Sequence, residues 1–195
     1  MTIDIIIYMC IYICVCIVVF DILFAANIWL GNRFLPRRAE YLEKLMKKRL
    51  SKTGKLNSHF ANKLCRHLGN DSWLLAYLHA YNRLKQEYGE ASKEIGTIQN
   101  FNILLFRKLS KAYSGMNEED KAFFAHIVYL VIPNADNEDT HFRLKLLLVQ
   151  RLAALMNSRS VYVRGNAFRA IVKTGNVQYI YYAITLMEGS IHLRN

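Results

Sequence analysis

The chain has little that interrupts a helix. Only two prolines occur in its 195 residues, Pro36 and Pro133. No run of residues alternates apolar and polar side chains for the length of a strand, which is the pattern that predicts a half-buried β-strand. Both absences weigh against a sheet, and the sequence therefore predicts an all-α fold.

Signatures of catalysis and of metal binding are also missing. The sequence contains no His-Glu-x-x-His, Cys-x-x-Cys or Gly-x-Ser-x-Gly. "SKTGK" lacks the upstream glycine of a phosphate loop, and "NADNEDTHFRLK" has Asp139 where a calcium loop needs glycine. The six histidines are too scattered to form a metal site. We therefore expect no enzyme, no cofactor and no metal.

A long uncharged run opens the chain. Residues 5–20 read "IIIYMCIYICVCIVVF", and "ILFAANIWL" follows Asp21. The run of about 26 mostly apolar residues exceeds the roughly 20 that a helix needs to cross a bilayer. A cleaved secretory signal is disfavoured because the residues before the run include Asp4 and no Lys or Arg. We expect residues 1–32 to form a single transmembrane anchor, with three of the four cysteines inside it and no disulfide.

Positive charge is concentrated just after this run. The net charge is −2 over residues 1–32, +9 over residues 33–66 and +4 over residues 67–195. The positive-inside rule then predicts a short N-terminus outside the cell (inner) membrane and a cytoplasmic C-terminal domain.

Residues 33–55 are expected to form a basic amphipathic juxtamembrane helix. Pro36 suits its first turn and Gly54 its end, and Leu42, Leu45 and Leu50 share one face. Two interpretations stay open: the basic side chains bind anionic lipid headgroups, or they only fix the topology. The candidate membrane-surface residues are Arg33, Arg37, Arg38, Lys44, Lys47, Lys48, Arg49 and Lys52.

Residues 56–195 are predicted to form a helical domain. Breaks at glycine and asparagine predict helices over 57–68, 71–88, 97–113, 118–132, 139–157, 160–173 and 177–187. Short loops between helices of this length predict antiparallel hairpins. We expect them to stack as a repeat array, incomplete at the C-terminus.

A repeated pattern supports stacking over a closed bundle. "SVYVRG" at residues 160–165 matches "SIHLRN" at 190–195, thirty residues later. Ala61, Leu64 and Gly69-Asn70 are spaced like Ala167, Ala170 and Gly175-Asn176. A fixed period of 20 to 50 residues is typical of a solenoid.

Residues 160–187 resemble a HEAT repeat, of the kind found in membrane-anchored bacterial proteins. The resemblance is carried by a Val-Arg-x-x-Ala-x-x-Ala-Ile helix, a Gly-Asn turn and a second helix, through Val163, Arg164, Ala167, Ala170, Ile171, Gly175 and Asn176. It implies an α-solenoid that binds other macromolecules. The family usually has an aspartate before Val-Arg, where this chain has Ser158, Arg159 and Ser160.

The expected function is that of a membrane-tethered scaffold or adaptor that binds a protein partner. The resemblance makes a membrane-associated enzyme such as a glycosyltransferase a conceivable partner, and Tyr179, Tyr181 and Tyr182 are candidate contact residues. One alternative is a ligand-responsive regulatory adaptor. The other is a basic solenoid that binds nucleic acid, which the modest +4 charge of residues 67–195 disfavours.

Overall fold

The computed structural model describes the backbone of residues 2–133 and 142–192, and the side chains of residues 8, 9, 11–26, 33–133 and 146–186. Throughout these ranges the regular structure is helical, which confirms the all-α class. The chain divides into two units, residues 1–37 and residues 38–195, and each is described by itself. Most of "NADNEDTHFRLK" lies outside the described residues.

The first unit is helical and belongs to α1, Thr2–Thr53. The side chains of residues 11–26 are all exposed, including those of Phe20 and Phe24, whose rings stack on one another. Among the described residues, no helix combines the length and the apolar content needed to cross a bilayer.

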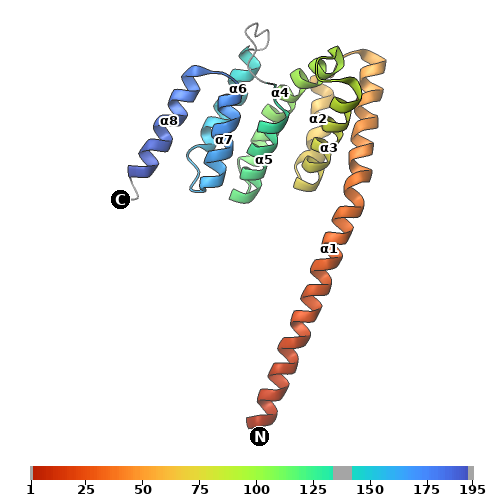
Figure 1. Ribbon diagram of the computed structural model, residues 1–195, viewed down its shortest axis with the longest axis vertical. Helices are drawn as coiled ribbons and strands as arrows, with labels where there is room; N and C mark the ends of the chain where they lie inside the picture. The colour runs from red at the N-terminus through yellow and green to blue at the C-terminus, as the bar shows by residue number, and fades with distance from the viewer. Residues whose placement is uncertain (1, 134–141, 193–195) are drawn as a thin grey trace. The chain divides into compact units, whose positions relative to one another are not determined.

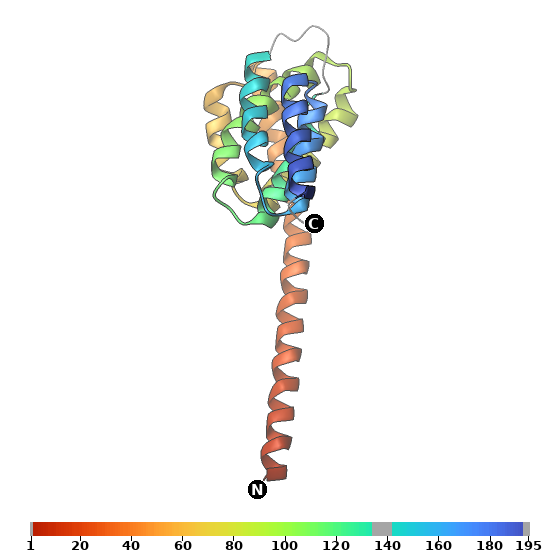
Figure 2. The ribbon, with the colours of Figure 1, turned by 90° about the vertical axis from the view of Figure 1, so that its left-hand side faces the viewer.

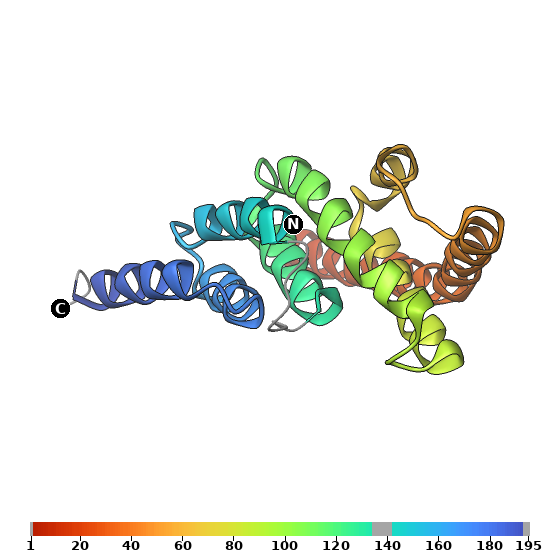
Figure 3. The same cartoon turned by 90° about the horizontal axis from the view of Figure 1, so that it is seen from above.

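The second unit is an array of two helical layers, visible in Figures 1 and 3. One layer contains α2 (Ser58–Leu68), α4 (Lys93–Tyr113) and α6 (Phe142–Leu155), and the other contains α3 (Asp71–Tyr88), α5 (Glu118–Val131) and α7 (Val161–Lys173). Each helix packs on the next helix of its own layer: α4 contacts α2 and α6, and α5 contacts α3 and α7. The last helix, α8 (Val177–His192), packs on α6 and α7 and is nearest the viewer in Figure 2.

Local caps explain most helix boundaries. The side chains of Asn57, Asn70 and Asn117 accept hydrogen bonds from backbone N–H groups in the first turns of α2, α3 and α5. Gly54 and Gly175 adopt φ values of 61° and 69°, the left-handed conformation that ends a helix most easily with glycine. The predicted ends at these positions are confirmed.

Three boundaries differ clearly from the prediction, and one of them is the end of α8, which lies at His192 and not at 187. The α4 helix begins at Lys93 and not at 97, because the Ser92 hydroxyl accepts from the Ile95 N–H at 3.2 Å, while Gly96 continues the helix. Pro36 lies inside α1 and not at a helix start. A proline removes one backbone hydrogen bond, and here the helix continues on both sides of it.

Aromatic side chains fill the space between the two layers. Phe124 of α5 is fully buried, and its ring stacks on that of Tyr113 of α4 at 4.6 Å between centroids and lies 6.0 Å from that of Phe106. A buried polar link runs beside them: the Tyr77 hydroxyl donates to Asn102 Oδ1, and Asn102 Nδ2 donates to the Val131 carbonyl oxygen. The core therefore joins α3, α4 and α5.

Small side chains lie where α5 and α7 pack together. Ala125 of α5 and Ala167 and Ala170 of α7 are fully buried, as are Val163 and Ile171. Two side chains of α7 also reach carbonyl groups of α5: Asn166 Nδ2 donates to Ala122 O at 3.0 Å and Lys173 Nζ to Tyr129 O at 2.7 Å. These bonds join α7 to α5 of the preceding hairpin.

The thirty-residue period is wrong as a description of the repeating unit. The helices α3, α5 and α7 begin at residues 71, 118 and 161, more than forty residues apart. Ser160 precedes α7, whereas Ser190 lies inside α8, so these two matched serines do not occupy equivalent places. The other match is better: Asn70 and Asn176 both cap a helix after a glycine, although Gly69 has a negative φ.

Candidate functional site

Charge is divided unequally between the two layers of the array. In the sequence, α2, α4 and α6 (the basic layer) carry nine Lys or Arg and one carboxylate, Glu94. The helices α3, α5 and α7 (the mixed layer) carry six Lys or Arg and five carboxylates. A surface with one sign of charge attracts ligands of the opposite sign. The basic layer is therefore the better candidate for a site that binds an anion.

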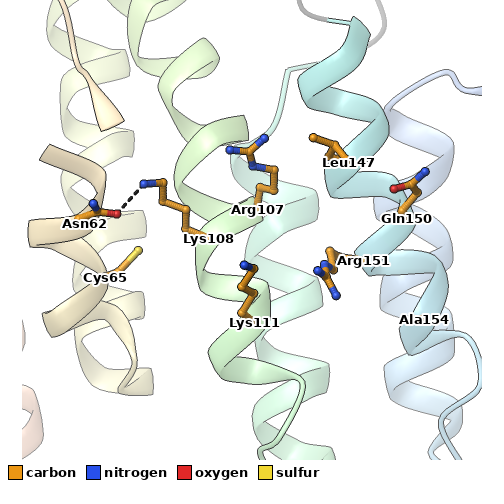
Figure 4. Close-up of a pocket in the computed structure, with 9 residues that line it drawn as sticks. All are labelled: Asn62, Cys65, Arg107, Lys108, Lys111, Leu147, Gln150, Arg151 and Ala154. Carbon is orange, nitrogen blue, oxygen red and sulfur yellow. Dashed lines mark hydrogen bonds between the residues drawn. The ribbon is translucent and has the colours of Figure 1, made fainter. Parts of the chain in front are cut away.

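A groove of about 860 Å³ runs across this layer (Figure 4). The side chains around it come from all three helices, with Asn62 on α2, Lys111 on α4 and Gln150 on α6 among them. The full lining, here called the basic groove, is Asn62, Cys65, Arg107, Lys108, Lys111, Leu147, Gln150, Arg151 and Ala154. It contains four cationic side chains, two amides and no carboxylate.

Lys108 connects two walls of the groove. Its Nζ donates to Asn62 Oδ1 at 2.5 Å and to Ser58 Oγ at 2.7 Å, so the side chain crosses from α4 to the first turns of α2. Figure 4 shows the bond to Asn62. Lys108 therefore fixes the spacing of α2 and α4 and leaves its charge in the groove without a carboxylate partner.

The other three cations are available to a ligand. Within the described part of the chain, Arg107, Lys111 and Arg151 make no ion pair or side-chain hydrogen bond. Lys111 and Arg151 are exposed, and Arg107 is half-buried. Cations that face one another without a counterion repel, and an anion bound between them relieves that repulsion.

The rest of the lining is apolar and small. Leu147 and Ala154 of α6 face the groove together with Cys65 of α2. Burial raises the pKa of the Cys65 thiol, although the nearby Lys108 charge acts in the opposite direction. The thiol is therefore neutral at physiological pH and behaves as a small apolar group, not as a nucleophile.

A second hollow of about 420 Å³ adjoins the groove at the C-terminal end of α6. Arg151 and Ala154 line both spaces, and Lys121 and Arg159 add positive charge to the second. The one carboxylate there, Glu118, accepts hydrogen bonds from Lys121 and Ser158, which hold its pKa below the usual range. The groove therefore extends along α6 without meeting an unpaired acid.

The predicted membrane-surface residues divide into three groups. Three have partners in the second unit: Arg38 contacts Ser72 and the Trp73 ring, Lys44 pairs with Glu40, and Lys47 pairs with Glu43 and Glu87. Lys48, Arg49 and Lys52 line a separate pocket on the array. Arg33 and Arg37 are exposed side chains of the first unit.

The other predicted residues lie outside the basic groove. Arg164 donates to the carbonyl groups of Ser158 and Arg159, just before its own helix. Tyr181 and Tyr182 are exposed on α8, whereas Tyr179 is half-buried and its N–H donates to Asn176 Oδ1. They stay candidates for partner contact. Sequence reasoning missed the groove because its residues are spread over three helices.

Comparison with protein-family models, with curated proteins and with solved structures found no match. The site must therefore be interpreted from its own residues, which are four cations, two amides and three apolar side chains with no carboxylate among them.

Proposed function

We propose that the chain is a membrane-anchored scaffold whose helical array binds an acidic segment of a partner protein in the basic groove. The observation that carries this proposal is the groove itself, with four cations from α4 and α6, two amides and no carboxylate. Because helical arrays expose extended surfaces between stacked hairpins, they commonly hold protein segments in this way.

A protein segment fits the groove better than a nucleic acid. Proteins that bind single strands stack bases on aromatic side chains, and the basic groove is lined by none. Leu147, Ala154 and Cys65 offer instead an aliphatic surface for the side chains between the acids of a peptide. The groove volume of about 860 Å³ also falls within the range of small-molecule sites, so an anionic small ligand is the second candidate.

The proposal of a membrane anchor is based on the sequence of the first unit. The uncharged run of residues 5–20 and the apolar residues after Asp21 are long enough to span a bilayer, and the positive charge after them predicts a cytoplasmic array. Exposed apolar side chains such as Val15 and Val18 would be covered by lipid. The helical array in the second unit also fits the HEAT-like resemblance.

The groove is tested by peptide titration. The full chain in detergent is titrated with a fluorescent Glu-rich peptide, and Arg151→Glu is expected to weaken binding about tenfold, the equivalent of about 1.4 kcal/mol. Arg169→Glu on α7 is the matched control, since it makes the same charge change in the mixed layer. Equal losses for both variants, or tighter binding of a single-stranded oligonucleotide than of the peptide, would overturn the proposal.

The anchor is tested by fractionation of the full chain. Val18→Arg places a charge inside the apolar run, which costs about 2.5–3.5 kcal/mol at the centre of a spanning helix. We expect the natural chain to stay in the membrane pellet after alkaline extraction and the variant to shift toward the supernatant. A natural chain that is itself extracted by alkali would refute the anchor.

A further inference from the structure

A second basic pocket lies between the last turns of α1 and the start of α2. Its volume is about 330 Å³, and it is separate from the basic groove. The lining, here called the α1–α2 pocket, consists of Leu45, Lys48, Arg49 and Lys52 from α1 and His59, Phe60 and Lys63 from α2. Four permanent cations and a histidine surround a small space that has no carboxylate in its lining.

One lining residue of this pocket has a donor that is buried without a partner. The Nε of Arg49 is shielded from solvent and makes no hydrogen bond. A buried unsatisfied donor costs about 1–3 kcal/mol, and more when the group is charged. Within the described residues no carboxylate pairs with Lys48, Lys52 or Lys63 either. The repulsion between the cations of this pocket is therefore not offset by a carboxylate of its lining.

Helix dipoles explain only part of this cluster. Lys52 lies in the last turn of α1, where the negative end of the helix dipole attracts a cation. His59 lies in the first turn of α2, where the helix dipole disfavours positive charge. Lys63 lies one turn later, where the dipole no longer has a strong effect. Lys48 and Lys52 are also like charges four residues apart, an arrangement that destabilises a helix. Fold stability alone does not account for these positions.

We infer that the α1–α2 pocket binds a phosphate group, carried either by a soluble phosphomonoester or by the headgroup of an anionic lipid. Arginine donates to phosphate oxygens with a geometry that suits them, and lysines contribute compact charge from both helices. The N-terminus of α2 adds a favourable dipole for an anion. The inference is independent of the proposed function, because none of the groove residues lines this pocket.

The test uses the full chain in neutral detergent, titrated with inorganic phosphate by calorimetry. In parallel, the chain is reconstituted in phosphatidylcholine vesicles with or without phosphatidic acid, and the melting temperature is compared. Arg49→Gln and Lys63→Gln are expected to weaken phosphate binding or the lipid-dependent stabilisation about tenfold. Lys44→Gln is the control: it removes a charge from the same helix, at an exposed residue that pairs with Glu40 outside the pocket.

Binding of inorganic phosphate that both pocket variants weaken supports a soluble phosphate ligand. Stabilisation by phosphatidic acid alone, lost in the same variants, supports a lipid headgroup. Equal effects of Lys44→Gln and the pocket variants would overturn the inference, as would no response to either probe. Lys63→Gln, at an exposed site on α2, keeps the test valid if Arg49→Gln fails to fold.

Discussion

The two layers of the array contain clusters of opposite charge, acids in the mixed layer and cations in the basic layer. In the mixed layer, acids lie next to acids: Asp71 at the start of α3 contacts Asp120 at the start of α5. In the basic layer, Arg107, Lys111 and Arg151 share a groove that no carboxylate lines. The acid contact is partly relieved inside the chain, by proton uptake and by the Tyr113 hydroxyl 3.2 Å from Asp71. The lining of the groove offers no such internal relief, and this difference is why the proposed binding site lies in the basic layer.

Packing divides the layers in the same way. The mixed layer is tightly joined, with alanines between α5 and α7 and side-chain bonds to carbonyl groups across that contact. In the basic layer, Lys108 spans from α4 to α2, and side chains of α2, α4 and α6 line the basic groove. Helices therefore pack on one another in both layers, and the difference lies in the hollows: about 860 Å³ in the basic layer and about 350 Å³ between α5 and α7.

The largest expected effect tests whether both layers share one core. Phe124→Ala removes a fully buried ring that contacts Tyr113 and Phe106 of the opposite layer, and should lower the free energy of unfolding by about 3–5 kcal/mol. Denaturant titration followed by circular dichroism measures it, with the half-buried neighbour Phe123→Ala as control. Equal costs for the two variants would contradict a core centred on Phe124.

The next effect tests the polar link between the layers. Tyr77→Phe removes the hydroxyl that donates to Asn102 Oδ1, leaving a buried acceptor without that partner. We expect a loss of about 1–3 kcal/mol in the free energy of unfolding. Tyr41→Phe, at an exposed ring on α1, should change stability far less. Asn102→Leu also removes the donor to the Val131 carbonyl oxygen, so the double variant should cost less than the sum of the two single variants, and additive costs would refute the link.

A smaller effect tests the absence of carboxylates in the groove. Gln150→Glu places an acid beside Arg107 and Arg151, where it competes with an incoming anion. The affinity for the Glu-rich peptide should fall about fivefold, close to 1 kcal/mol. The matched control is Gln86→Glu on α3, an exposed position in the mixed layer. If both variants bind equally well, charge in the groove does not determine the affinity.

The sequence predicts the helices well and the groove poorly, for one physical reason. Helix ends depend on neighbours such as Asn57, Asn70 and Gly175, whose caps act within a few residues. The groove depends on positions from Asn62 to Arg151, which come together only when α2, α4 and α6 stack. One signal for the groove is present in the sequence. The predicted helices that correspond to α2 and α6 contain almost no acidic residues.

The smallest effect is a pH dependence that belongs to the mixed layer. Burial and the adjacent Asp120 raise the pKa of Asp71 from 3.8 to about 6, so the folded state binds a proton more tightly than the unfolded chain. The stability from that proton is present below pH 4 and is lost as the pH rises through about 6. Asp71→Asn removes the ionisable group and should be more stable than the natural chain above pH 7, by about 1 kcal/mol or less because the site is partly solvated.

Urea denaturation at pH 4 and at pH 7.5 measures this difference. Asp120→Asn should reproduce the gain at pH 7.5, since it removes the other member of the pair, whereas Glu119→Gln, at an exposed neighbour, should not. An equal gain for Asp71→Asn at both pH values would show that the carboxyl pair does not control stability. Because Asp71 and Asp120 lie at the starts of α3 and α5, away from the groove lining, peptide affinity should be unchanged in these variants. If the free energy of unfolding depends on pH and the peptide affinity does not, the titrating pair belongs to the mixed layer and peptide binding to the basic layer.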